Sequence, residues 1–229
     1  QIGTLQLPGC FAMTETGHIP VLLEPVLRLL NPRPGQTIID GTLGRAGHAI
    51  HLARRIAPGG RLIGLDVDPA NLAFARQQLE SLDLDVQLDL IHANFATVRG
   101  TLRDLGLDRA DGLLVDLGFA SNQMEDRQRG LSFSTDGPLD MRLDPRLPRS
   151  AADLVNELGE KELADLIYQL GEERLSRRIA RKICENRLKS PMKSTVALAR
   201  IVREAYGNQA RRQRIDPATR TFMALRMAV

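Results

Sequence analysis

The sequence predicts an α/β fold, a parallel sheet with flanking helices, followed by a basic and mostly helical segment. In the first half of the 229-residue chain, short apolar runs alternate with stretches of helical periodicity, which is typical of strand–helix–strand units. After about Met124 the strand-like runs stop, and helical patterns dominate from Ala151 onward. The composition, 43% hydrophobic and 26% charged, excludes a disordered tail. Because no apolar stretch of about 18 residues occurs, we expect no membrane span.

The first half is expected to hold three helices and four strands. The first helix stops at Asn31-Pro32, and the third begins at Asp68-Pro69, where an aspartate N-cap precedes a proline. The expected helices cover 21–30, 49–56 and 68–82. The expected strands are short apolar runs at 37–40, 61–66, 86–91 and 112–116.

The second half begins with residues 125–149, which are rich in Asp, Arg, Gly and Pro and predict an ordered loop or linker. Four helices are expected after it, at 151–157, 160–169, 172–189 and 195–206. Residues 174–229 hold 15 Lys and Arg against 3 Asp and Glu. This excess would attract a polyanion such as RNA, although a solvated helical surface has the same pattern.

A glycine-containing turn, residues 40–48, joins the first strand to a helix. Open α/β sheets bind ligands at the carboxyl ends of their strands, where glycines let the backbone approach the ligand. Asp66 ends the second strand, 26 residues after Asp40, at a position suited to ribose hydroxyls. Dinucleotide sites and S-adenosylmethionine sites share this plan, but the G-x-G-x-x-G fingerprint is not matched. Strand-end acids at Asp40, Asp66 and Asp116 suit a cationic sulfonium better than a pyrophosphate, which favours a methyltransferase over an NAD-dependent oxidoreductase.

Asp116, which closes the fourth predicted strand, has two interpretations. In such folds this position faces the reacting end of the cofactor. A helix N-cap explains an aspartate there equally well.

Seven separated motifs give the chain a closer resemblance. They are Gly17–Leu22, Asp40–Gly44, Asp116–Gly118, Arg129–Phe133, Asp136–Arg142, Gly171–Arg174 and Pro217–Phe222. With them the sequence resembles the bacterial RsmH (MraW) family of ribosomal RNA small-subunit methyltransferases, from about Gly17 to Val229. The run Asp136–Arg142 is the most specific of the seven.

The resemblance implies a Rossmann-like, S-adenosylmethionine-dependent methyltransferase. Its reaction would be methylation of the exocyclic N(4) of one cytosine in the decoding region of 16S rRNA. The cofactor-binding core would cover residues 14–126. A helical, basic insert for RNA recognition would cover 127–216, and the chain would start to return to the core at 217–229. Because the family continues into further core strands, we expect these C-terminal strands to be missing here. The expected location is the cytoplasm, and the expected partner is 16S rRNA in the small ribosomal subunit. We expect no binding to DNA or to a membrane. The alternative function is that of a non-catalytic RNA-binding or assembly factor.

The resemblance also implies site residues. The backbone at 46–48 would approach the methionine part of the cofactor, Asp66 would accept the ribose hydroxyls and Phe95 would pack on the adenine. Asp116 would be the catalytic residue, accepting a hydrogen bond from the cytosine amine. The full cofactor set carried over is Ala46, Gly47, His48, Asp66, Phe95, Asp116 and Gln123. The histidine spacing predicts no metal site.

Two departures from the family pattern affect this site. Ala46 stands where the family usually has glycine, which is tolerable only if Ala46 keeps an ordinary backbone conformation. Residues 119–122, Phe-Ala-Ser-Asn, replace the usual Val-Ser-Ser-Pro beside the target-base pocket. Phe119 is a candidate stacking partner for the base, or a core residue.

Overall fold

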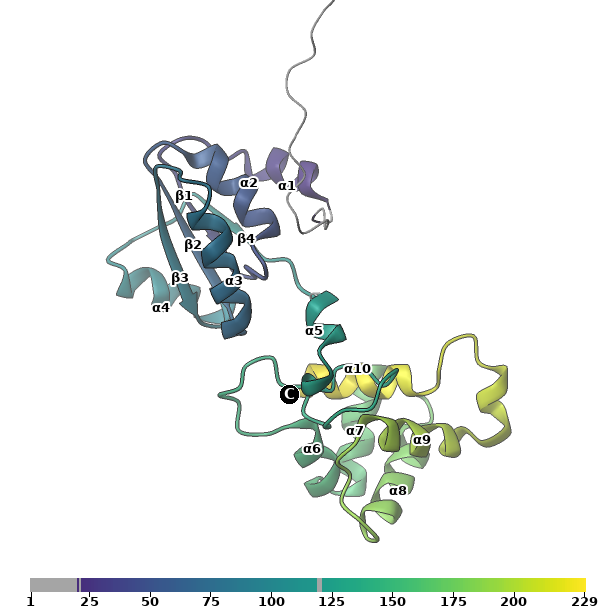
Figure 1. Cartoon of the computed structure of the whole chain (residues 1–229). Helices are drawn as coiled ribbons and strands as arrows, with labels where there is room; N and C mark the ends of the chain where they lie inside the picture. The colour runs from purple at the N-terminus through teal and green to yellow at the C-terminus, as the bar shows by residue number, and fades with distance from the viewer. Residues whose placement is uncertain (1–19, 21, 119–120) are drawn as a thin grey trace, which may run out of the picture. The chain divides into compact units, whose positions relative to one another are not determined.

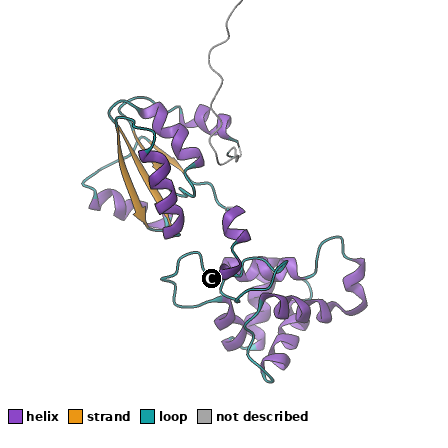
Figure 2. Cartoon of the chain, viewed as in Figure 1, coloured by secondary structure: helices purple, strands orange, loops and turns teal. Residues whose placement is uncertain are grey.

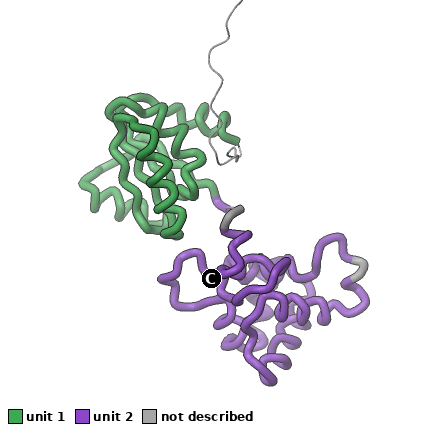
Figure 3. The backbone as a smooth tube through the Cα atoms, viewed as in Figure 1, with its two compact units in different colours: residues 1–116 green, residues 117–229 purple. Residues whose placement is uncertain are grey.

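A computed structural model of the chain describes residues 20, 22–118 and 121–229. The chain divides into two compact units, unit 1 at 1–116 and unit 2 at 117–229 (Figure 3). These boundaries differ from the expected ones, because residues 117–126 and 217–229 both belong to the helical unit 2.

Unit 1 contains a four-stranded sheet whose strands are all parallel, as the alternating pattern predicts (Figure 2). The strands are β1 (Thr37–Asp40), β2 (Gly60–Asp66), β3 (Val86–His92) and β4 (Gly112–Leu114). Their order is β3-β2-β1-β4, so β2 and β4 lie on opposite sides of β1. This reversal is the topological switch point, where open α/β sheets bind their ligands.

Helices cover both faces of this sheet (Figure 1). The helices are α1 (Leu23–Leu30), α2 (Gly47–Ile56), α3 (Pro69–Glu80) and α4 (Val98–Asp104). Ile38 and Leu62 pack in one buried cluster with residues of α1, α2 and α3, whereas Ile39 and Ile63 pack in a second cluster with α4. Successive strand residues point to opposite faces, so apolar side chains on both faces mark a sheet buried on both sides.

The structure changes some of the expected boundaries. Strand β4 ends at Leu114, two residues earlier than predicted, so Asp116 follows the strand rather than closing it. The helix expected at 172–189 begins only at Ser176, because Glu172 adopts a left-handed φ of 49° that ends the preceding helix. Helix α4 and the helix at 218–228 were not predicted.

Unit 2 packs its helices around one buried cluster. They are α5 (Ser121–Glu125), α6 (Ala151–Glu157), α7 (Glu160–Gly171), α8 (Ser176–Arg187), α9 (Thr195–Tyr206) and α10 (Ala218–Ala228). Phe222 of α10 is fully buried, and its ring meets that of Phe133 edge-on at 4.7 Å between centroids. Residues 218–228 therefore belong to the helical core of unit 2.

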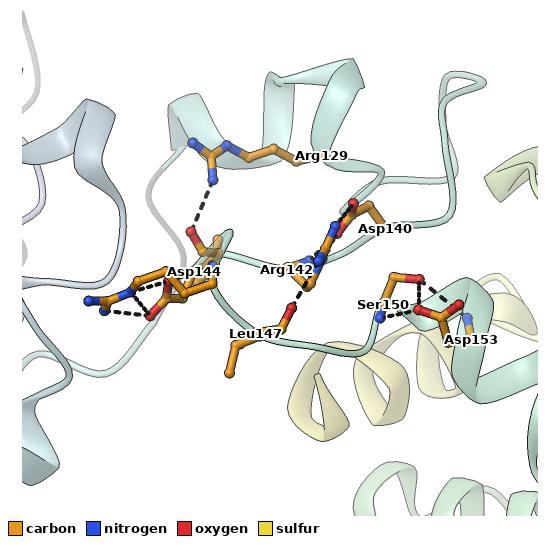
Figure 4. A network of polar contacts seen from close by, with 9 residues as sticks. Arg129, Asp140, Arg142, Asp144, Leu147, Ser150 and Asp153 are labelled. Atoms are coloured by element: carbon orange, nitrogen blue, oxygen red, sulfur yellow. Dashed lines mark hydrogen bonds and ion pairs between the residues drawn. The ribbon is translucent and has the colours of Figure 1, made fainter.

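The loop at 125–149 is fastened to this unit by polar contacts (Figure 4). The Arg142 guanidinium donates to both oxygens of Asp140, at 2.7 and 2.8 Å, and to the Leu147 carbonyl at 2.9 Å. Ser194, before α9, donates to Asp136 at 2.5 Å. Gly130 takes a left-handed φ of 61° against Pro138, whose carbonyl oxygen leaves no room for a side chain. The motifs at 129–133 and 136–142 thus have a structural role in unit 2.

No helix within the described ranges is both long and apolar enough to cross a membrane. Within the same ranges, no three His, Cys, Asp or Glu side chains are grouped so as to hold a metal ion.

Candidate functional site

The carboxyl ends of β1 and β2 and the segment after β4 bring three carboxyl groups together. Asp40 is almost fully buried and accepts a hydrogen bond from the Thr42 backbone N–H at 3.1 Å. Burial raises the pKa of Asp40 from 3.8 to about 7; the Thr42 bond lowers it, and the carboxylates of Asp66 and Asp116 raise it further. Asp66 and Asp116 therefore lie near enough to Asp40 to act on its carboxyl group.

Asp66 organises the turns around it. Its two oxygens accept hydrogen bonds from the backbone N–H groups of Gly44 at 2.7 Å and Asp68 at 2.8 Å, and a longer one from Asn71 Nδ2 at 3.5 Å. Burial raises the pKa of this carboxyl group, and the bonds from Asp68 and Gly44 oppose that rise. Asp66 therefore ties the glycine turn after β1 to the end of β2.

The turn itself contains an alanine in a left-handed conformation. Ala46 has φ 67° and ψ 22°, so it does not keep the ordinary backbone conformation that the sequence analysis set as the condition for tolerating its methyl group. This geometry costs a non-glycine residue about 1–2 kcal/mol. The methyl group is fully buried in the unit 1 core, which offsets part of that cost.

Glycine is needed at the next position. A Cβ at Gly47 would lie 2.9 Å from Cγ of Pro20, closer than carbon atoms normally pack. Helix α2 begins at Gly47, so its positive N-terminal end lies at this edge of the sheet. His48 follows and is nearly buried.

Asp116 is the exposed member of the acidic group. Its backbone N–H donates to Thr42 Oγ1 at 2.7 Å, and its Oδ2 lies 3.9 Å from Nδ1 of His48. The side chain is 60% exposed, so this carboxylate is accessible to a substrate. The N-cap interpretation is not supported, because the helix that follows begins only at Ser121.

Phe95 lies beside the glycine turn. A Cβ on Gly41 would come within 3.0 Å of Phe95 Cβ and 3.3 Å of Val115 Cγ2, so the absence of a side chain lets the three residues meet. Phe95 is 39% exposed, so part of this residue is available to a ligand. An exposed aromatic face, a helix N-terminus and carboxylates fit the adenine, carboxylate and ribose of S-adenosylmethionine.

Gln123 belongs to unit 2, where it is buried on α5. Its assignment to the cofactor stays a prediction. Residues 17–19, 21, 119 and 120 lie outside the described residues, so the first motif and the stacking role of Phe119 also stay predictions.

Thr42 and Asn71 are site residues that the sequence analysis did not single out. The Thr42 hydroxyl holds the backbone of Asp116, and Asn71 supports Asp66. Thr42 lies within the Asp40–Gly44 motif, but its partner is 74 residues away, and no local pattern indicates that pairing.

The raised pKa of Asp40 makes unit 1 sensitive to pH. Between about pH 4 and 7 the folded state keeps a proton that the unfolded state has lost, so stability falls as pH rises through this range and levels off above it. We expect Asp40→Asn, which keeps an oxygen for the Thr42 bond, to remove the contribution of Asp40 to this dependence. Chemical denaturation at pH 5 and pH 8 measures this. Between the two pH values the free energy of unfolding of the parent should fall by about a few kcal/mol more than that of the variant. An equal pH dependence in both proteins would contradict the buried, protonated Asp40.

Comparison with known proteins bears on what this site does. A family model described as the MraW methylase family matches residues 15–229. The chain belongs to the MraW methylase family. A "Ribosomal RNA small subunit methyltransferase H" of Geobacter sulfurreducens is 46% identical over 212 residues, covering 93% of this chain and 68% of that protein. Proteins of the same name from Brevibacillus brevis (43% identical, covering 93% and 67%) and Acidobacterium capsulatum (46%, covering 95% and 72%) are similarly close.

Membership in the MraW methylase family establishes the class of chemistry. The chain is a methyltransferase with a Rossmann-like α/β core, and S-adenosylmethionine is its methyl donor. The oxidoreductase that the strand-end pattern left open is therefore not supported. The sequence-based prediction of family, fold, activity class and cofactor is confirmed.

Proposed function

We propose that this methyltransferase methylates the exocyclic N(4) amine of a cytosine in the decoding region of 16S rRNA. The observation that carries the proposal is the exposed carboxylate of Asp116 at the switch point of a methyltransferase sheet. The relatives named as ribosomal RNA small-subunit methyltransferases support the substrate class. We expect the reaction to take place in the cytoplasm, on the small ribosomal subunit or its RNA.

Asp116 would act on the amine. The nitrogen lone pair of a cytosine amine is delocalised into the ring, so the amine is a poor nucleophile. A carboxylate that accepts one amine N–H favours a pyramidal nitrogen, whose lone pair leaves conjugation with the ring and points at the methyl group. The same carboxylate stabilises the positive charge that develops on nitrogen and receives the released proton. The Thr42 hydroxyl fixes the backbone from which this carboxylate projects.

The other site residues would hold the donor, which supplies a methyl group on a sulfonium sulfur when bound. The N-terminal end of α2 at 46–48 suits the carboxylate of the methionine part. Asp66 suits the ribose hydroxyls, and the exposed part of Phe95 suits the adenine. Gln123 is included as a further cofactor residue on the family resemblance alone.

Unit 2 would bind the RNA. Its exposed basic residues include Arg174, just before α8, and Arg177, Arg178 and Arg181 within it. Phosphate contacts by such residues make affinity fall steeply with salt concentration.

Phe95 offers a test of the cofactor site. We expect Phe95→Ala to weaken S-adenosylmethionine binding by about 5- to 150-fold, the range for losing one aromatic–base stack of 1–3 kcal/mol. Phe95→Leu keeps the bulk without the aromatic ring and should fall in between. Calorimetric titration checks this, and unchanged affinity in the alanine variant would remove Phe95 from the site.

Methyl transfer tests the proposed function itself. The chain is incubated with methyl-labelled S-adenosylmethionine and either unmethylated 16S rRNA or small subunits that contain it, and the RNA is digested to nucleosides. We expect label in N(4)-methylcytidine. Label in another nucleoside would contradict the proposed target. RNA binding without transfer to either substrate would instead favour the alternative, a non-catalytic binding or assembly factor.

A further inference from the structure

Unit 2 contains a polar cavity of its own. It has a volume of about 400 Å³ and is lined by Tyr168, Gln169, Glu172, Arg174 and Arg220. Two of these residues, Glu172 and Arg174, belong to the Gly171–Arg174 motif. The acidic site of unit 1 uses none of the five, and only Arg174 was named above, among the basic residues of unit 2.

The local backbone explains how these residues come together. A side chain on Gly171 would collide with the carbonyl oxygen of Arg220, so glycine at the end of α7 lets α10 approach closely. Arg220 then reaches across and donates from Nη1 to the Glu172 carbonyl at 3.2 Å. The left-handed φ of 49° at Glu172 ends α7 and turns the chain toward Arg174.

The motif alternates between inward and outward side chains. Glu173 is 1% exposed and accepts hydrogen bonds from the Tyr206 hydroxyl at 2.7 Å and the Leu175 N–H at 2.8 Å. With Glu173 held inside, its neighbours Glu172 and Arg174 are exposed on the surface. Gly171 and Glu173 are therefore structural, whereas Glu172 and Arg174 are available to a ligand.

The exposed groups have the chemistry that binds one unstacked nucleotide. Tyr168 is 59% exposed, a large aromatic side chain that the fold leaves in solvent. The guanidinium groups of Arg174 and Arg220 line the same cavity and can bind a phosphate. The Gln169 amide and the Glu172 carboxylate can form hydrogen bonds with the donors and acceptors of a base edge. Proteins recognise single-stranded RNA by such stacking on aromatic rings combined with base-edge hydrogen bonds.

We propose that this cavity binds a single unpaired nucleotide of the substrate RNA, separate from the cytosine that is methylated. The base stacks on Tyr168, and Arg174 and Arg220 contact its phosphate. This inference rests on the proposed function, since it assumes an RNA substrate. It assigns unit 2 a specific anchoring point in addition to its general positive charge.

Binding of the full chain to an unmethylated 16S rRNA fragment, measured without methyl donor, tests the proposal. Tyr168→Ala should weaken binding by about 5- to 150-fold and leave the salt dependence unchanged, because it removes a stack and no phosphate contact. Tyr168→Phe keeps the ring and should stay within about twofold of the parent. Arg174→Gln should lower the salt slope by about 1. Lys189→Gln, which removes the same charge beyond the other end of α8, is its matched control and should change affinity less.

Thermal unfolding of each variant first establishes that it is folded. Parent-like affinity in folded Tyr168→Ala would overturn the proposal, and so would equal losses in Arg174→Gln and Lys189→Gln with Tyr168→Ala unaffected. A loss confined to Tyr168→Ala and Arg174→Gln would support it. Because binding is read without methyl transfer, a chain that binds through this cavity but never methylates the RNA would leave the inference standing while the proposed function fails.

Discussion

Asp116→Ala is expected to lower the rate of methyl transfer by about 100- to 1,000-fold, the range for removing one oriented group that stabilises transition-state charge. The fold should tolerate this change, because the side chain is 60% exposed and the contact that holds this position comes from the backbone N–H. RNA affinity should change little, since the basic residues that would bind phosphates belong to unit 2. Single-turnover kinetics at saturating donor and RNA measure the effect.

Two further variants sharpen this test. Asp116→Asn keeps an oxygen that accepts a hydrogen bond but lacks the charge and cannot take up the proton, so it should remain strongly impaired. Asp108→Ala removes an exposed aspartate elsewhere in unit 1 and should behave as the parent. Near-normal turnover in Asp116→Ala would exclude Asp116 from the chemistry.

Asp66→Ala is expected to destabilise unit 1 by about 2–4 kcal/mol and to abolish measurable donor binding. Two backbone N–H groups, of Gly44 and Asp68, lose the acceptor that now satisfies them. Each buried donor left without a partner costs about 1–3 kcal/mol. Relief of the buried carboxylate, whose pKa is raised by burial, offsets part of this loss. Denaturant unfolding and calorimetric titration measure the two effects.

The matched control is Asp89→Ala. Asp89 is a half-buried carboxylate of β3 that accepts from Arg61 at 2.7 Å, away from the carboxyl ends of the strands. Its loss should cost about 1 kcal/mol and leave donor binding intact. If Asp66→Ala bound the donor as tightly as Asp89→Ala does, the strand-end site would be assigned to the wrong residues.

The periodicity of the sequence was sufficient to predict the four strands of unit 1, because parallel strands buried on both faces are continuous apolar runs. Strand β1 has the predicted bounds, and Asp68 caps α3 as its position before Pro69 indicates. The acidic group was predictable for the same reason, since carboxyl ends of parallel strands lie at one edge of the sheet. Contacts between residues that are distant in sequence were not predictable. The hydrogen bonds between Asp116 and Thr42 and between Arg226 and the Leu131 carbonyl leave no local signal in the sequence.

The left-handed backbone conformation of two residues was also not predicted from the sequence. Ala46 and Glu172 are both left-handed, although neither is glycine. Local propensity disfavours that geometry. At Ala46 the burial of the methyl group compensates for its cost, and at Glu172 the close packing of α7 on α10 does so. The motif around Asp136–Arg142 identified the family, yet its contacts in unit 2 are structural.

Hydrogen exchange of the full chain with and without S-adenosylmethionine tests the central claim, that the donor binds at the carboxyl ends of β1, β2 and β4. At a concentration about 100 times the dissociation constant, the bound state gains about 2.7 kcal/mol, so amides that open only after release should exchange about 100-fold more slowly. We expect this protection in the turn at 40–48, around 66–71 and near Phe95 and Asp116. Protection confined to unit 2, or none in a folded chain with bound donor, would contradict the assignment.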